Sequence, residues 1–245
     1  MAVGREMFVP KPKESVPRFA VPKEVQDLLR AERVREDVCF LEVPFIKSLC
    51  GSSGNNIFKW GAAVVGVASG FYEADKGACT WAVKREIAHI KSSDVFMTNV
   101  VSLICQLAAS IFGCSYLSFL PAVALAWSVG YAAIALFSRW REAKADDFAI
   151  KHSSVDELMG GKAFLIAQQE INVAYRQTAF LGKLLISPSG EKRLNLHCPS
   201  LASRIKKIEQ ALVDRHESTS QEGERERVDA LKGCMEKQIF PVRFA

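Results

Sequence analysis

Residues 95–137 read VFMTNVVSLICQLAASIFGCSYLSFLPAVALAWSVGYAAIALF and contain no Asp, Glu, Lys, Arg or His. The parts 95–113 and 121–137 are each long enough for a helix to cross a bilayer core of roughly 30 Å. Gly113, Ser115, Ser118 and Pro121 predict a turn between them. The alternative is a buried helical hairpin in a soluble core, but so long an uncharged run is uncommon in soluble domains. We therefore expect a transmembrane helical hairpin.

Basic residues stand on both sides of this stretch: Lys84, Arg85 and Lys91 before it, and Arg139, Arg141 and Lys144 after it. Basic flanks at both ends fit an even number of spans whose ends share the cytoplasmic side. The N-terminal residues MAVGREMFVPKPKE include no apolar segment typical of a cleavable signal peptide. The sequence thus predicts an integral membrane protein with two spans and both termini in the cytoplasm.

Immediately before the hairpin, residues 81–90 read WAVKREIAHI. Residues 86–89 match the last four positions of the motif H-E-x-x-H, in which two histidines on one helix face bind zinc and the glutamate is the general base. Taken alone this match is weak, because a solvated Glu86 and an ordinary His89 would give the same letters.

The segment that follows the hairpin gives the match more weight. Residues 138–149 read SRWREAKADDFA, which resembles the signature S-R-x-x-E-x-x-A-D of the HtpX-type and CAAX-prenyl-protease-type zinc metallopeptidases. The resemblance implies that His89 and Glu142 are zinc ligands and that Glu86 is the catalytic base. It also implies that Asp146 contacts a zinc ligand without binding the metal itself. Glu142 and Asp146 are four residues apart and so face the same way on a helix. A two-span hairpin returns the chain to the same membrane face, which would bring both motif helices together.

The sequence departs from this family at Arg85, which stands where the first histidine is expected. A guanidinium group has no free lone pair and stays charged, so it cannot bind zinc. Catalytic zinc normally has three protein ligands and a water, and only His89 and Glu142 remain in place. We therefore expect zinc to be the implied cofactor but to be bound weakly or not at all. We also expect Arg85 to pair with Glu142, Asp146 or both; the alternative is contact with a lipid phosphate.

Other ligands could substitute for the missing histidine. Asp146 is one candidate, because it should lie near Glu142 on the same helix face. Cys79 should face elsewhere on its helix, whereas His152 and His197 cannot be placed from sequence. The family often carries T-H-P-S followed by R-I, and here His197 to Ser200 and Arg204 with Ile205 resemble that pattern. His197 is one position early, so no role is transferred to it.

The resemblance implies an α+β, mostly helical, zincin-like metallopeptidase domain with a small β-sheet and an inserted transmembrane hairpin. We divide the chain into an extended arm (1–22), an N-terminal part of the peptidase-like domain (23–94), the hairpin (95–137), a C-terminal part (138–213) and a charged tail (214–245). We expect residues 214–232 of the tail to be solvated. Apolar patterning predicts strands at 38–46 and 62–67, a loop at 51–56, and helices at 23–36, 75–90, 138–152, 154–184 and 199–213.

Composition narrows the possible partners. The net charge of +5 is mild and the basic residues form no stripe with aromatics, so no nucleic-acid partner is expected. Seven cysteines without a CxxC pair indicate free thiols in a reducing compartment. The favoured function is a membrane-associated zinc metalloendopeptidase, impaired by Arg85, that acts on membrane or misfolded proteins. The alternatives are a pseudopeptidase that serves as a membrane scaffold and a two-span membrane protein with accidental motif matches.

Overall fold

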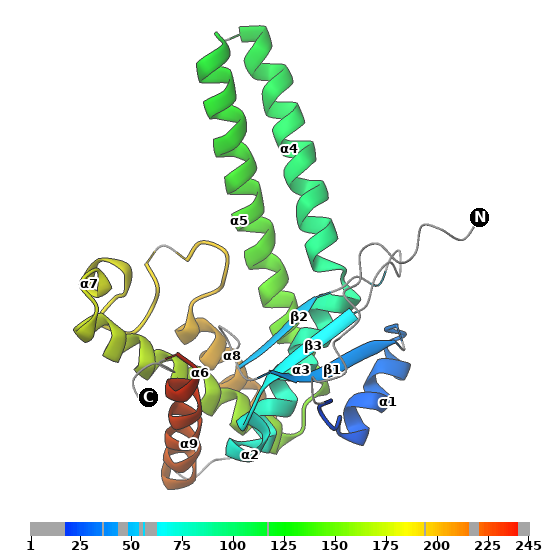
Figure 1. The fold of residues 1–245 in the computed structure, drawn as a ribbon, viewed down its shortest axis with the longest axis vertical. Coiled ribbons are helices and arrows are strands. Elements are labelled where there is room, and N and C mark those ends of the chain that lie inside the picture. The colour runs from blue at the N-terminus through cyan, green and yellow to red at the C-terminus, as the bar shows by residue number, and fades with distance from the viewer. Residues whose placement is uncertain are drawn as a thin grey trace.

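The computed structural model describes residues 18–35, 37–43, 49–53, 56, 63–116, 118–193, 195–215 and 221–239. This part of the chain is mostly helical and holds one small sheet, as expected for the α+β class (Figure 1). The strands are β1 (Val38–Val43), β2 (Cys50–Ser53) and β3 (Ala63–Ala68). The helices are α1 (Lys23–Ala31), α2 (Phe71–Ala74), α3 (Lys76–Lys91), α4 (Asp94–Tyr116), α5 (Phe119–His152), α6 (Val155–Thr178), α7 (Gly182–Leu185), α8 (Leu201–Asp214) and α9 (Gln221–Ile239).

The sheet has the strand order β1-β3-β2, with β3 parallel to β1 and antiparallel to β2. The prediction of a loop at 51–56 was wrong for residues 51–53, which belong to β2. Gly51, Ser52 and Ser53 have weak intrinsic strand preference, but pairing with β3 satisfies their backbone groups and overrides it. Strand β2 is an edge strand that packs against α3, so it forms one wall beside the motif helix.

Helix α3 is the central element of the core. Asp75 begins it by accepting a hydrogen bond from the backbone N–H of Ala78 at 2.8 Å. The helix packs on β2 and β3 with one side and on α6 with another, and its Trp81 and Ile87 are fully buried. The polar groups of the motif therefore project from a helix that is covered on several sides, and they must find partners within the protein.

Helices α4 and α5 pack against each other and project from the body as a hairpin (Figure 1). By length and composition, 96–113 and the apolar part of α5 could each cross a membrane. Only 17% and 22% of the residues in these apolar windows are buried, which contradicts the alternative of a buried core hairpin. Ile111, Leu120 and Trp127 are each at least 70% exposed. Apolar side chains displayed on this scale suit a non-aqueous surrounding.

The separate polar helix expected at 138–152 does not exist, because α5 runs without interruption from Phe119 to His152. Within α5 no proline follows Pro121, which lies in the first turn, where the missing N–H costs little. The second apolar segment of the hairpin and the second motif thus lie on one continuous helix, and the position of Glu142 depends directly on the hairpin.

Residues 214–232 were expected to be solvated, and for 221–232 this was wrong. They belong to α9, which packs on α6 and buries Val228, Leu231 and Met235. These three side chains recur at helical spacing and form a narrow apolar stripe. The sequence pattern did not reveal it, because most of the residues around the stripe are charged. Residues 1–17 of the predicted arm lie outside the described residues, and Phe19 donates its backbone N–H to the carbonyl of Phe40 at 3.1 Å.

Candidate active-site cleft

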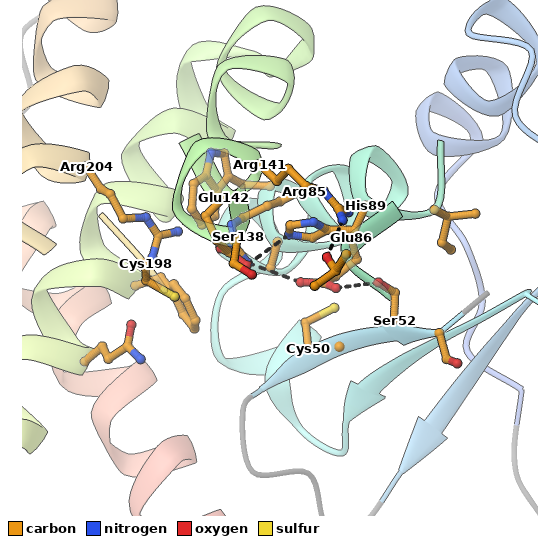
Figure 2. A pocket seen from close by; sticks show the side chains of 18 of the residues that line it. Cys50, Ser52, Arg85, Glu86, His89, Ser138, Arg141, Glu142, Cys198 and Arg204 are labelled. Atoms are coloured by element: carbon orange, nitrogen blue, oxygen red, sulfur yellow. Dashed lines mark hydrogen bonds and ion pairs between the residues drawn. The ribbon is translucent and has the colours of Figure 1, made fainter. Parts of the chain in front are cut away.

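The two sequence motifs meet where α3 packs against α5. Figure 2 shows Arg85, Glu86 and His89 of α3 facing Glu142 of α5. Because α3 packs directly against α5, the side chains of both motifs converge on one cleft.

Arg85 is the centre of this arrangement. Its Nη2 donates to Glu142 Oε2, and its Nε donates to Asp146 Oδ1 at 3.0 Å. Its Nη1 lies 3.3 Å from Glu86 Oε1. The guanidinium is only 16% exposed, so these bonds form largely out of water. The expected ion pairs of Arg85 with both carboxylates are therefore present, and the structure does not support contact with lipid phosphate as its main role.

Asp146 has a second cationic partner that sequence reasoning did not assign. Arg204 of α8 donates from Nε and Nη2 to the two carboxylate oxygens, at 2.7 and 2.9 Å. This is the bidentate geometry in which guanidinium and carboxylate pair best. Asp146, whose side chain is 3% exposed, joins α5 to α3 through the partly buried Arg85 and to α8 through the buried Arg204.

His89 lies beside the same carboxylate as Arg85. Its Nε2 is 3.7 Å from Glu142 Oε1. Burial, and next the nearby Arg85 cation, lower the pKa of His89 from its ordinary 6.5 to about 4. The imidazole is therefore neutral at physiological pH.

Glu86 receives a hydrogen bond from the edge strand. Ser52 Oγ donates to Glu86 Oε2 at 2.6 Å. This contact depends on β2 being a strand next to α3, and so the misassigned loop also concealed a site residue. Glu86 is thereby fixed between Ser52 and Arg85, with its side chain only 10% exposed.

A cavity of about 680 Å³ lies at the base of the hairpin, and Arg85, Glu86 and Glu142 are among the residues that line it (Figure 2). Residues from β2 form one wall, and Thr98 and Asn99 of α4 with Ser138 and Arg141 of α5 form the wall nearest the hairpin. Arg141 Nη1 donates to Thr98 Oγ1 at 2.8 Å, which joins α4 to α5 at this point. The cavity is large enough for a short stretch of peptide.

The residues of this cleft do not fit a zinc ion. Arg85 directs its guanidinium to Glu142 and Asp146, so a permanent cation already occupies the space between the motif helices. Among the residues that the structure describes, no three His, Cys, Asp or Glu side chains converge to hold a metal. His89 and Glu142 together supply only two of the three protein ligands that catalytic zinc requires.

Of the four substitutes considered from sequence, Asp146 is held by Arg85 and Arg204, and the other three lie elsewhere. Cys79 is completely buried in the core. His152 Nε2 lies 2.9 Å from Glu32 Oε1, and the His197 ring contacts the Tyr131 ring edge-on at a centroid distance of 5.5 Å. None of the three lines the cleft.

Comparison with known proteins adds one finding. The family model described as peptidase family M48 matches residues 85–212, which is more than half of the chain. The chain belongs to peptidase family M48. No curated protein and no solved structure matches it significantly.

Family M48 is a metallopeptidase family that generally depends on zinc. The match spans both motifs, the hairpin and α8, so it supports the family expected from the sequence. The structure brings together all five predicted site residues, namely Arg85, Glu86, His89, Glu142 and Asp146. Sequence reasoning missed Ser52, Arg141 and the pairing role of Arg204. For Arg204 a signal existed, because Arg204 and Ile205 are part of the segment that resembles the family's C-terminal pattern.

Proposed function

We propose that this chain is a membrane-anchored M48-family protein that binds segments of other proteins in its cleft without zinc-dependent cleavage. The observation that carries the proposal is the bonding of Arg85 to Glu142 and Asp146. The HtpX-type or CAAX-protease-type architecture, with the hairpin between the two motifs, is part of the proposal.

The charges explain how the cleft persists without a metal. Glu86, Glu142 and Asp146 are close together and mostly buried, and carboxylates so placed repel one another. Arg85 and Arg204 offset them with planar donors that need no coordination chemistry. The arginines thus preserve the arrangement of three helices, but they leave no open metal position at which water could be activated.

The cleft's position favours membrane partners. Thr98, Asn99 and Ser138 place its wall at the base of the hairpin. With the hairpin in the bilayer and both termini in the cytoplasm, the cleft would lie at the membrane surface. A protein segment that emerges from the bilayer could enter it, and so we propose membrane, membrane-proximal or misfolded proteins as partners.

A second candidate is an active metallopeptidase with an unidentified ligand. It is favoured by the retention of Glu86, His89 and Glu142 around one cavity, with Glu86 held by Ser52. The two functions differ in their metal content.

The test measures zinc in purified, detergent-solubilised protein by mass spectrometry. We expect far less than one zinc ion per wild-type chain. We expect close to one ion in the variant Arg85→His, because the new imidazole would join His89 and Glu142 as a third ligand. The control Arg85→Lys, which keeps the cation, should stay metal-free, and Arg85→His combined with His89→Ala should lose the gain. Tightly bound stoichiometric zinc in the wild type, with cleavage of a protein substrate, would overturn the proposal.

A further inference from the structure

The connection between α6 and α8, residues 179–200, displays apolar side chains outside the hairpin. Phe180 is 99% exposed and Leu184 is 65% exposed, and Leu181 and Leu196 are each more than half exposed. Neighbouring Ile186 is buried, so the connection is anchored to the body and presents a definite apolar surface. Exposed apolar side chains that recur within one short connection are typical of a contact surface.

The exposed charges of this connection are all positive. Lys183, Lys192 and Arg193 are exposed. The one acidic residue in 179–200 is Glu191, whose carboxylate accepts the backbone N–H groups of Leu201 and Ala202 at 3.0 and 2.8 Å. Its charge is thus used at the first turn of α8. Apolar side chains next to basic residues complement an anionic lipid surface.

Part of the connection also lies beside the apolar segment of α5, at the level where that helix would enter the bilayer. The His197 ring contacts Tyr131 of α5 edge-on. Tyr131 precedes Arg139 by eight residues, which is about 12 Å along a helix. Figure 1 shows α7 and the chain that follows it on the side of the body from which the hairpin projects. If α5 crosses a bilayer, residues near His197 reach the level of the lipid.

We propose that residues 179–200 form a second membrane-binding surface, which inserts Phe180, Leu181, Leu184 and Leu196 into the leaflet that the hairpin enters. Lys183, Lys192 and Arg193 would contact its anionic headgroups. Each basic residue near such a surface should favour the inserted state about fivefold. The inference rests on the proposed membrane anchoring of the hairpin. Two attachments would fix the orientation of the body, and with it the cleft, relative to the bilayer.

The experiment uses the full chain in liposomes of phosphatidylcholine and phosphatidylglycerol, with lipids brominated near the headgroup end of the acyl chain as quenchers. Phe180→Trp and, as a second variant, Leu184→Trp report on the connection. Val213→Trp is the control, because Val213 is also exposed (64%) but precedes Arg215, which binds the carbonyls of Ile150 and Ser153 at the far end of α5. Comparison of wild type with Trp127→Phe reports separately on the hairpin.

We expect the emission added at position 180 or 184 to be quenched at least as strongly as that of Trp127, and less so when phosphatidylglycerol is omitted. Emission added at 213 should be unaffected. If Trp127 is quenched and neither new tryptophan is, the inference fails while the membrane anchor stands, and the apolar surface serves a protein partner. Equal quenching at 213 would indicate non-specific adsorption and would also overturn it. Absence of quenching at every position would reject the anchor and the inference together.

Discussion

The shared carboxylate of Asp146 makes a measurable prediction about coupling between α3 and α5. The perturbations are Arg85→Met, Asp146→Asn and their combination. Arg85→Met keeps a side chain of similar length but removes the bonds to Asp146 and Glu142. Asp146→Asn keeps the shape and removes the charge that both arginines face.

The magnitudes follow from what each variant leaves behind. Removing one partner of a buried ion pair typically costs about 3–5 kcal/mol. Arg85→Met should cost less, about 2–3 kcal/mol, because Asp146 keeps its two bonds to Arg204 and Glu142 remains 23% exposed. Asp146→Asn should cost about 3 kcal/mol, since two guanidinium groups lose their anion. The Arg85–Asp146 interaction is lost only once in the double variant, whose cost should fall short of the sum by about 1–2 kcal/mol.

The assay is equilibrium unfolding by urea in detergent micelles, followed by the fluorescence of Trp81, which is buried and lies beneath the guanidinium of Arg204 at 6.0 Å. The matched control is the exposed pair of Lys207 and Asp147, which also joins α8 to α5, at 2.9 Å. Removing it should cost no more than about 1 kcal/mol. Strictly additive losses for Arg85→Met and Asp146→Asn would refute the coupling, and with it the account of Arg85 as the cation that holds the motif helices.

Two further predictions concern packing and pH. Gly160→Ala should destabilise the protein by about 1–3 kcal/mol, because its Cβ would lie 2.2 Å from the backbone nitrogen of Ala78 where α6 crosses α3. Gly233→Ala, whose added Cβ meets nothing within 4 Å, should instead stabilise α9 by about 0.5–1 kcal/mol; the urea unfolding assay measures both variants. Because the pKa of His89 is lowered to about 4 in the folded protein, the unfolded state binds the proton more readily between pH 6.5 and 4, and stability should fall by about 2 kcal/mol from pH 7 to pH 5. His89→Gln should remove most of that loss, and an unchanged pH profile in this variant would show that other groups cause it.

Several features could be predicted from local sequence because they depend on local physics. The uncharged run at 95–137 predicted the paired long helices, since its length and composition are properties of the segment itself. The spacing of Glu86 to His89 and of Glu142 to Asp146 predicted which side chains share a helix face. The presence of Arg85 predicted the misfit to zinc, because the chemistry of guanidinium is the same in every setting.

Other features were decided only by tertiary contacts. Ser52 joined the site because β3 supplies hydrogen-bond partners to a Gly/Ser-rich segment, and Arg204 joined it because α8 packs across α5 at Asp146. Residues 221–239 became a packed helix because α6 offers a surface for Val228, Leu231 and Met235. The sequence by itself determined the long apolar hairpin and the presence of an arginine at position 85. The tertiary structure decided which cationic groups form ion pairs with the buried carboxylates, because residues far apart in sequence can pair only where their segments pack together.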